Sequence, residues 1–475
     1  MGGRLLEEEE EDAAAHDSTA LIVVNQLCER FAWYVFSGTY IMYSTRALAQ
    51  SSVVADASYS NWNALTYLCP LLGGLVADVW LGRYRTVRGA FAVYVVGAAG
   101  LCVAAAYPTP WLFYASVLVL AFGAGSAKPN VSALGADQVP DEAARERYFG
   151  RLYAAMNAGS TLAFTMGVSV AQTYGFLPAW ALATAVLGAS AAALAARSGG
   201  LVKKEPEGSP LVVVVHVLGD ALRGGSLDAA RRSAGGRRDD DDVDMVRSLR
   251  DLAPCFCLLV VFWGAQAQTT TTLFNQACQL NLHGWVPVAS LAVFNSGCIV
   301  ALMPVCDDVL FPALRRRGVA VTTTRRIVAG MGVLALCLGL GALLERRRLV
   351  LARRGLYAPR PSPCYADGGP KATLLSVAWQ VPVFSLSGLA EVLAGVAAME
   401  HFYAVAPPRA KSLCSAIELV SVSLGFLFGG CSVVLANAVS PPWVPTDLDG
   451  GRLDVFLGLW AALLVASTAL YARAR

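Results

Sequence analysis

The sequence predicts an all-α membrane protein of about twelve transmembrane helices, arranged as two six-helix bundles. Three observations predict this class. The 475 residues are 56% hydrophobic and only 15% charged, whereas a soluble domain carries roughly 25% charged residues. Apolar stretches of spanning length, roughly 20 residues each, alternate with short basic clusters. One long polar stretch divides these apolar segments into two sets of equal number.

The N-terminal half begins with an acidic tail and continues into six apolar segments. Residues 7–12 are all acidic, and such a block is expected to be disordered, so we assign residues 1–20 to a disordered cytosolic tail. The N-terminal bundle then covers residues 21–200. Its predicted spans are 26–48, 61–82, 86–106, 110–130, 150–172 and 176–197.

A charged stretch over 201–247 separates this bundle from the next, and we predict that it is a cytosolic linker. It contains the pair Arg237-Arg238 followed by four aspartates, Asp239 to Asp242. The C-terminal bundle covers 248–475. Its predicted spans are 252–274, 286–311, 326–344, 373–398, 411–436 and 453–472. Two such halves joined by a charged linker are typical of a carrier.

Basic residues predict the orientation, because lysine and arginine are enriched in cytosolic loops. Four short loops carry them, and all four fall on the side of the linker if both termini are cytosolic. The residues are Arg83, Arg85, Arg88, Arg145, Arg147, Arg151, Arg315, Arg316, Arg317, Arg325, Arg326, Arg409 and Lys411. One outer loop disagrees with the rule, since it carries Arg346, Arg347, Arg348, Arg353, Arg354 and Arg360.

Ionisable residues inside apolar segments cost roughly 2.5–3.5 kcal/mol each at a helix centre and therefore mark functional sites by default. They are Glu29, Arg30, Lys128, Glu391 and Glu418. Glu29 and Arg30 are adjacent and point to different parts of the helix surface, so we expect each to meet a separate partner. Glu418 lies closer to a helix end and could reach the interface.

Lys128 and Glu391 have opposite charges and lie in opposite halves. We predict that they pair across a central cavity. Protonation of Glu391, or binding of a solute at Lys128, would then break the pair and release a gate. The alternative is a static ion pair that only holds helices together.

Other polar residues form a loop motif and a candidate solute pathway. Asp78 and Arg83 lie in and beside a short cytosolic turn, where Asp78 can pair in one conformation and be released in the other; the alternative is a basic loop that only fixes topology. The candidate solute-binding residues are Tyr34, Gln266, Asn295 and Trp379, together with Lys128 and Glu391. For each uncharged residue, helix–helix hydrogen bonding is an equal alternative.

Composition also argues against several classes of protein and site. The net charge of +3 is too small to indicate a nucleic-acid partner. The four histidines form no metal-ligating cluster, and the twelve cysteines are scattered without a CxxC pair, so we expect free thiols and neither a metal nor a disulfide framework. No phosphate-binding loop and no nucleophile–base pair is present, which indicates neither an ATP-driven pump nor an enzyme, and no cofactor is expected.

Several motifs resemble those of the proton-dependent oligopeptide transporter family, and in particular its plant nitrate/peptide transporter branch within the major facilitator superfamily. They are GGLVADVWLGRY at 73–84, KPNVSALGADQ at 128–138, YAAMNAGS at 153–160, PEGSP at 206–210 and LDGGRLD at 448–454. The resemblance runs from about residue 20 to the C-terminus. It implies the major facilitator fold and a proton symporter that alternates access between two bundles.

The resemblance also implies roles for particular residues. Lys128 and Glu391 match the family's fourth-helix lysine and tenth-helix acid. The family's Glu-x-x-Glu-Arg motif of the first helix reads Gln26-Leu27-Cys28-Glu29-Arg30 here, so its first acid is replaced by an amide that cannot titrate. Gln266 stands where nitrate carriers of the family use a histidine, so nitrate recognition through that imidazole is not expected.

We therefore predict proton-coupled symport of a small polar or anionic solute, of the peptide, nitrate, hormone or glycoside class. Its partners are the solute, protons and the lipid bilayer, with the plasma membrane favoured and the vacuolar membrane as the alternative. Gln26 motivates a second hypothesis, a facilitator that moves solute without protons. The linker, which looks short between 232 and 243, motivates a third, a degenerate member that acts as a membrane sensor or interaction protein.

Overall fold

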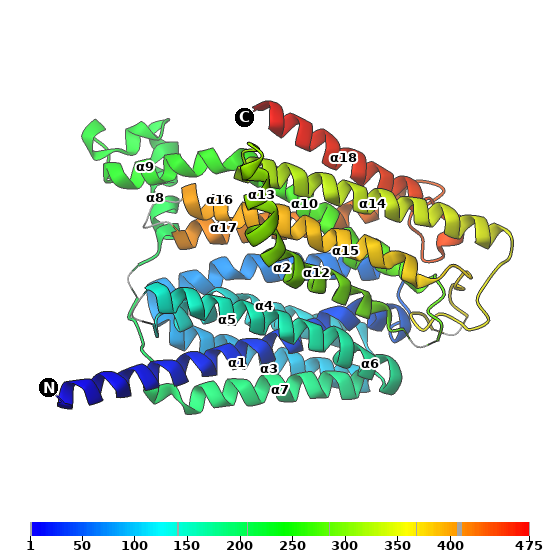
Figure 1. Ribbon diagram of the computed structural model, residues 1–475, viewed down its shortest axis with the longest axis horizontal. Helices are drawn as coiled ribbons and strands as arrows, with labels where there is room; N and C mark the ends of the chain where they lie inside the picture. Colours follow the sequence, from blue (N-terminus) through cyan, green and yellow to red (C-terminus); the bar gives the residue numbers. More distant parts are fainter. Residues whose placement is uncertain are drawn as a thin grey trace.

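The computed structural model describes residues 2–139, 142–206, 208–284, 286–366, 368–405 and 411–474. The N-terminal half occupies one side of the molecule and the C-terminal half the other (Figure 1). The helices of the N-terminal half are α1 (Gly2–Arg46), α2 (Ser52–Val76), η1 (Ala77–Leu81), α3 (Gly82–Ala106), α4 (Pro110–Ala136), α5 (Glu142–Leu162), η2 (Ala163–Gly167), α6 (Val168–Tyr174) and α7 (Phe176–Ala196).

The C-terminal half repeats this arrangement. Its helices are α10 (Ala253–Thr270), α11 (Thr272–Cys278), η7 (Val288–Leu291), α12 (Ala292–Pro304), η8 (Val305–Leu310), α13 (Phe311–Arg316), α14 (Thr323–Arg353), η9 (Val377–Gln380), α15 (Val381–Ala390), η10 (Glu391–Gly395), α16 (Val396–Val405), α17 (Lys411–Ala438), η12 (Leu448–Gly450) and α18 (Leu453–Ala474). Several consecutive elements, such as α15, η10 and α16, form one interrupted span.

Eight helical stretches in the described chain are long and apolar enough to cross a membrane, and one of them, 52–106, contains both α2 and α3. The remaining spans carry more polar residues: α1, α5 with α6, and α10 with α11. Together these make six spans in each half, as predicted. One hydrophobic core lies mostly in the N-terminal half and extends into the C-terminal half at residues such as Leu282 and Val377, and a second core lies in the C-terminal half and part of the linker.

The first helix differs from the sequence prediction at its N-terminal end. We expected residues 1–20 to be disordered, but the backbone of α1 is helical from Gly2. Glutamate, alanine and leucine, which make up most of residues 5–15, are strong helix formers. The side chains of residues 1–17 lie outside the described part of the chain.

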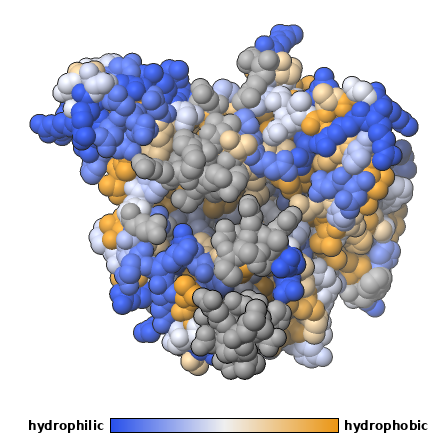
Figure 2. Space-filling view, turned by 60° about the vertical axis from the view of Figure 1, so that its left-hand side comes forward, coloured by the Kyte–Doolittle hydropathy of each residue, from blue (hydrophilic) through white to orange (hydrophobic). Residues whose placement is uncertain are grey.

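The linker between the halves is folded rather than extended. It contains η3 (Ser198–Gly200), α8 (Pro210–Gly224), η4 (Asp228–Ala230), η5 (Arg232–Ala234), α9 (Asp240–Leu249) and η6 (Arg250–Leu252). We call residues 210–249 the linker module. Arg231 binds both Asp228 and Asp244, and Arg238 binds Asp220 at 2.6 Å. Hydrophilic residues cover much of the module in the space-filling view, whereas the flanks of the bundles show apolar residues (Figure 2).

Hydrogen bonds between the described parts of the two halves run from the middle of the helices to the end of the molecule that is remote from the linker, which we call the outer end. Thr45 Oγ1 donates to the Cys364 carbonyl at 2.7 Å, and the Ser52 amide donates to Thr446 Oγ1 at 3.0 Å. Ser423 Oγ donates to the Ala64 carbonyl at 2.6 Å, with α17 packed along α2. The outer end is therefore closed in this conformation.

A disulfide joins Cys278, at the end of α11, to Cys364 in the loop between α14 and α15. The prediction of free thiols throughout the chain was therefore wrong at these two positions. Their separation of 86 residues gave no local spacing signal. The bond lies at the outer end, where an oxidising compartment permits disulfides, and this agrees with a cytosolic linker.

The arginine-rich outer loop that disagreed with the orientation rule is explained by the length of α14, which continues to Arg353. Arg348 is fully buried and binds Glu345, also fully buried, and Asp449. Arg346 binds Asp454 at 3.3 Å. Two of the outer arginines are thus neutralised by acids of their own bundle, so they are compatible with an outer location.

Candidate functional site

The charged motif of α1 forms one compact ion pair. Arg30 donates to both carboxylate oxygens of Glu29, from Nε at 2.5 Å and from Nη2 at 2.7 Å. Gln26 Nε2 donates to Glu29 Oε2 at 2.9 Å, one helical turn away. The prediction of separate partners for Glu29 and Arg30 was wrong, because both side chains are long enough to bend back and meet. The amide of Gln26 completes the coordination of the carboxylate.

Lys128 in α4 carries a buried ammonium group. Its Nζ lies 4.3 Å from the ring centre of Trp33 and 4.3 Å from that of Tyr67. No hydrogen-bonding partner for this nitrogen occurs among the described residues. Two cation–π contacts of roughly 0.5–2 kcal/mol each offset only part of the cost of removing an ammonium from water. The site is therefore electrostatically incomplete and would favour an anionic group.

Glu391 opens the π-helical element η10 of the C-terminal half and is held by amides. Its Oε1 accepts a hydrogen bond from Asn295 Nδ2 at 3.0 Å and another from Gln266 Nε2. The same two amides donate to Ser387 Oγ, at 3.0 and 2.7 Å. The three helical spans that contain α10, α12 and α15 thus converge on one carboxyl group. Gln266 and Asn295, both predicted to line a solute pathway, therefore contact the predicted gating acid in this conformation.

The predicted ion pair between Lys128 and Glu391 is absent from this conformation. Lys128 faces the aromatic rings of its own half, and Glu391 faces the amides of its own half. Tyr34 lies within electrostatic reach of both Arg30 and Glu391, and Tyr67 within reach of Glu391. Lys128 and Glu391 therefore face a shared region from opposite halves. Aromatic side chains lie near both charges, and the two charged groups do not contact each other.

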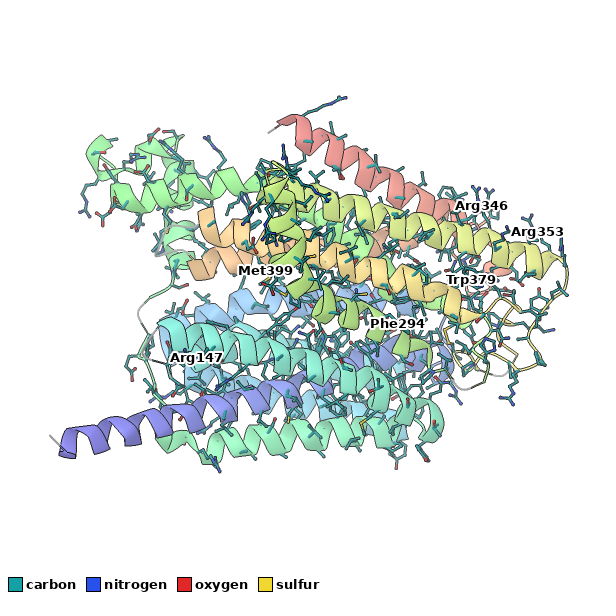
Figure 3. The ribbon with its side chains drawn as sticks, viewed as in Figure 1. Arg147, Phe294, Arg346, Arg353, Trp379 and Met399 are labelled. Carbon is teal, nitrogen blue, oxygen red and sulfur yellow. A yellow bond between two sulfur atoms is a disulfide. The ribbon has the colours of Figure 1, made fainter. Side chains whose placement is uncertain are left out.

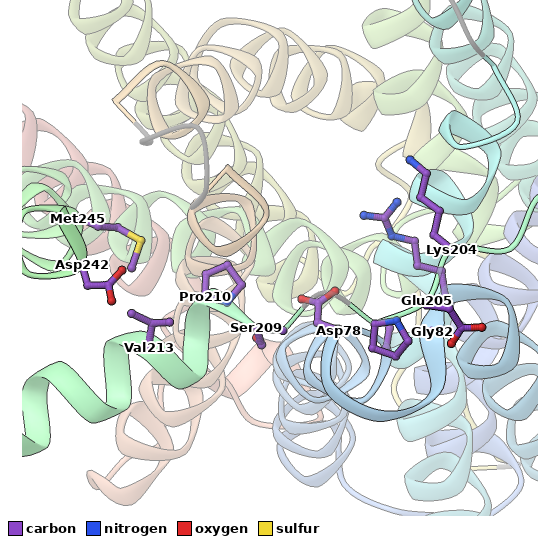
Figure 4. A pocket seen from close by; sticks show the side chains of 13 residues that line it. Asp78, Gly82, Lys204, Glu205, Ser209, Pro210, Val213, Asp242 and Met245 are labelled. Carbon is purple, nitrogen blue, oxygen red and sulfur yellow. The ribbon is translucent and has the colours of Figure 1, made fainter. Parts of the chain in front are cut away.

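At the linker end, Arg83 forms an ion pair with Asp137. Its Nη1 lies 2.5 Å from Asp137 Oδ2, and Lys204 Nζ lies 2.8 Å from Asp137 Oδ1. The backbone carbonyl of Asp78 accepts from the Gly208 amide at 3.0 Å. Asp78, Arg83, Lys204 and Gly208 border a cavity of about 600 Å³ between the α2–α3 turn and the linker (Figure 4). The motif therefore fastens the linker to the N-terminal half.

Two further predicted residues, Trp379 and Glu418, lie in η9 and α17 of the C-terminal half. Trp379 is 64% exposed and lies in η9, at the same end of the molecule as Arg346 and Arg353 (Figure 3). It does not contribute to the solute site in this conformation, and tryptophan is common at membrane–water interfaces. Glu418 is buried in α17, and its carbonyl accepts from Ser421 Oγ at 2.6 Å.

One buried acid that the sequence analysis missed lies between the halves. Asp56 is fully buried, and its Oδ2 accepts from Asn275 Nδ2 of α11 at 2.7 Å. Its Oδ1 is buried without a partner among the described residues. The predicted second span began at 61, which left Asp56 in a loop, whereas α2 begins at Ser52 behind the N-cap Ser51. That Ser-Ser cap was the available signal.

The described residues contain no group of three or more His, Cys, Asp or Glu that could hold a metal ion. The site instead combines one buried cation, one amide-bound carboxyl and several aromatic rings. Such a set can recognise charged ends of a small molecule, and the carboxyl can exchange a proton.

Comparisons with known proteins identify the family to which the chain belongs. A model of the POT family matches residues 84–235 and 226–443. Protein NRT1/PTR FAMILY 8.3 of Arabidopsis thaliana is 26% identical over 531 residues, covering 95% of this chain and 89% of that protein. Protein NRT1/PTR FAMILY 5.13 of the same plant is 28% identical over 514 residues, covering 93% and 89%.

Solved structures agree in fold. An auto inhibited POT family peptide transporter matches with a TM-score of 0.80 at 20% identity, covering 96% of this chain and 97% of that one. The POT family transporter PepTSo matches with a TM-score of 0.78 at 23% identity, covering 96% and 98%. The twelve-span, two-bundle major facilitator fold is thereby confirmed. The chain belongs to the POT family and is a multi-pass membrane transporter, not an enzyme.

Proposed function

We propose that this protein is a proton-coupled symporter of a small solute that carries a carboxylate or other anionic group, with a zwitterion such as a short peptide favoured. The observation that carries the proposal is the unpaired ammonium of Lys128, buried between Trp33 and Tyr67. A buried charge without a partner is costly, and a site retains it where a ligand supplies the partner.

The C-terminal half supports a zwitterion over a simple anion. The side chains that donate to the Glu391 carboxyl group are neutral amides, so a solute ammonium could add the missing positive charge. The carboxylate of the same solute would meet Lys128. Solved POT family transporters include complexes with 5-aminolevulinic acid and with a thioalcohol conjugated peptide. A zwitterionic solute would neutralise both halves at once and draw them together.

The proposed proton site is Glu391. Glu29 is already matched by Arg30 and Gln26, whereas Glu391 has only amide partners that hold it in either protonation state. One proton moving down about 100 mV and one pH unit supplies about 3.7 kcal/mol. For a solute without net charge, this supports accumulation on the order of 500-fold. A plasma membrane facing an acidic exterior provides such a gradient, and a vacuolar membrane is the alternative.

The test uses the full-length protein in liposomes with a panel of short peptides, nitrate and a glycoside, at mildly acidic and mildly alkaline external pH. We expect zwitterionic peptides to accumulate only when the outside is acidic. Glu391→Gln should abolish accumulation while exchange of labelled for unlabelled solute continues. Equal accumulation at both pH values, or nitrate uptake that does not require Lys128, would contradict the proposal.

A second candidate is a facilitator that moves solute without protons, and the contact of Gln26 with Glu29 favours it. An amide at this position donates its hydrogen bond permanently, as a protonated acid would, and it cannot release a proton. If this residue decides coupling, Gln26→Glu should make uptake depend on external pH. A pH dependence that is identical in Gln26→Glu and in the unmodified protein would count against this candidate.

A further inference from the structure

The outer end contains a cavity whose described lining includes none of the residues assigned to the solute site. Its volume is about 440 Å³, and it lies between α6 of the N-terminal half and two segments of the C-terminal half. These segments are the connection that follows α11 and the loop between α14 and α15, and Figure 1 shows this loop and α6 at the same end of the molecule. We call this space the outer cavity. Its size is usual for a small-molecule site.

The two C-terminal segments that border the outer cavity are tied to each other. The Asn281 amide donates to the Leu375 carbonyl at 2.8 Å, and the Val377 amide donates to the Asn281 carbonyl at 3.0 Å. The disulfide between Cys278 and Cys364 joins the same two segments covalently. This side of the cavity is therefore preformed, and a ligand would not have to order it on binding.

Arg360 is held at the rim of the outer cavity by a tight backbone turn. His283 and Gly284 follow each other with φ angles of +54° and +80°. A Cβ atom on Gly284 would lie 1.9 Å from Arg360 Nη1, so the glycine lets the guanidinium group lie directly against the turn. The His283 amide donates to Asn281 Oδ1 at 2.9 Å, which stabilises this conformation. A non-glycine residue with positive φ costs free energy, and such residues concentrate where ligands bind.

The polar groups of the outer cavity are not balanced within the protein. Arg360 makes no ion pair with a described residue, and the described lining contains no acidic side chain. On the N-terminal side, Gln172 Oε1 of α6 is buried without a hydrogen-bonding partner among the described residues. An unpaired buried acceptor is unfavourable, and a ligand that supplies a donor removes this cost. Leu280 and Leu282 are buried and add apolar surface to the lining.

We propose that the outer cavity is a second binding site, for a small carboxylate that carries one hydrogen-bond donor and an apolar body. The carboxylate would bind the guanidinium group of Arg360, whose planar donors match its geometry. The donor would meet Gln172 Oε1, and the apolar body would cover Leu280 and Leu282. The proposal depends neither on the identity of the transported solute nor on proton coupling.

Occupancy of this site has a consequence for transport. Gln172 belongs to the N-terminal half and Arg360 to the C-terminal half, so the site is complete only while the outer ends of the two halves are together. A ligand that binds one conformation better than the other shifts the population toward it. A carboxylate bound in the outer cavity would therefore stabilise the closed outer end and inhibit transport from outside.

The binding test uses the full-length protein in lipid nanodiscs and benzoylglycine, detected by ligand-observed NMR. This probe has a carboxylate, one amide N–H and an apolar ring, and it lacks the ammonium group of a zwitterionic solute. We expect saturable binding that Arg360→Gln weakens roughly tenfold or more, because a bond between charged groups is lost. Arg354→Gln should leave the affinity unchanged and is the matched control, since Arg354 is exposed at the end of α14 and does not line the cavity.

A second probe tests the contact with Gln172. The N-methyl derivative of benzoylglycine has no N–H, so it should bind the unmodified protein several-fold more weakly than benzoylglycine does. The two probes should bind Gln172→Leu with equal affinity. This pairwise comparison separates the loss of one hydrogen bond from a general loss of structure. A preference for benzoylglycine that persists in Gln172→Leu would overturn the assignment of the donor contact.

The effect on the outer end is measured with Ser60→Cys, a buried position beside Gly430 of α17. Its labelling by a membrane-impermeant thiol reagent should slow several-fold when benzoylglycine is bound, and this slowing should be absent in Arg360→Gln. An unchanged labelling rate at saturating probe would overturn the bridging of the two halves. Failure of the probe to bind the unmodified protein would overturn the site. So would binding that survives Arg360→Gln and is lost in Lys128→Met, because the probe would then occupy the central site.

Discussion

The C-terminal half contains two buried charged sites that are built in opposite ways. At the outer end, Arg348 is fully buried and satisfied by Glu345 and Asp449, with Tyr357 and Gln276 completing the network. At the centre, the hydrogen-bonding partners of the Glu391 carboxyl group among the described residues are neutral amides. The first site is electrically complete within one bundle, and the second is not. We therefore distinguish a structural charge, which is neutralised by partners in its own half, from a charge that lacks such partners and is proposed to meet a solute.

The largest effect should follow from breaking the complete site. Arg348→Met leaves Glu345 buried without its cation, and loss of one partner of a buried pair typically costs about 3–5 kcal/mol. We expect a clear fall in the thermal unfolding temperature of the purified protein. Uptake per folded molecule should be retained. A variant as stable as the unmodified protein would show that the outer network is not structural.

The buried ammonium of Lys128, which also lacks a charged partner within its own half, should respond in the opposite manner. Lys128→Met removes an unpaired buried ammonium, so the thermal unfolding temperature should stay equal or rise. Uptake of a zwitterionic solute should fall by roughly 30-fold or more, since loss of a buried charge partner costs about 2–5 kcal/mol of binding. Lys128→Arg is the matched control for charge. A Lys128→Met variant that lost stability but retained uptake would contradict this distinction between the two kinds of site.

Mutation of the contact between Asp56 and Asn275 tests whether the interface between the halves behaves like the complete site at Arg348 or like the incomplete site at Glu391. Asn275→Ala leaves both oxygens of a buried carboxyl without a donor, at a cost of about 1–3 kcal/mol to the closed outer end. We expect the outer end to open more often. The measurement is the labelling rate of a cysteine at the buried position Ser60, one helical turn from Asp56 and beside Gly430 of α17, by a membrane-impermeant thiol reagent. Asn275→Asp serves as a second variant beside Ser60→Cys. An unchanged rate in Asn275→Ala would exclude a gating contribution.

The smallest effect concerns pH and the linker module. Hydrogen bonds from Arg231 and then Arg247 hold the pKa of Asp228 below its usual value. A carboxyl with a lowered pKa stabilises the fold above its unfolded pKa of about 3.9, and this stabilisation is lost only as the pH falls through the lower, folded value. Proteolytic protection of the module should therefore be constant across mildly acidic pH. A loss of protection there would make the linker a source of any pH effect on uptake.

Much of the architecture could be predicted because hydropathy and loop charge act locally along the chain. The number of spans and the two halves follow from hydropathy and loop charge, and the cost of placing charge in lipid singles out Lys128 and Glu391 as candidates. The partners of these charges could not be predicted. Glu29 and Arg30 bind each other, and Arg83 binds Asp137, because side-chain reach and helix packing decide pairing.

The other errors of the sequence prediction concern the ends of helices and contacts between residues that are distant in sequence. Asp56 fell outside its span because the N-cap at Ser51 extended α2 beyond the apolar run. Trp379 was predicted as a pathway residue from its position near an apolar segment, yet the sequence does not tell which way a residue at a helix end faces. Cys278 and Cys364 gave no spacing signal, since their pairing depends on the path of the three helices between them.

That pairing has a topological consequence. Helices α12, α13 and α14 belong to a closed covalent ring that is sealed by the bond between Cys278 and Cys364. A single proteolytic cut between Cys278 and Cys364 leaves two fragments that are still joined by the disulfide. The two fragments would migrate together on a denaturing gel and separate only after a reductant is added.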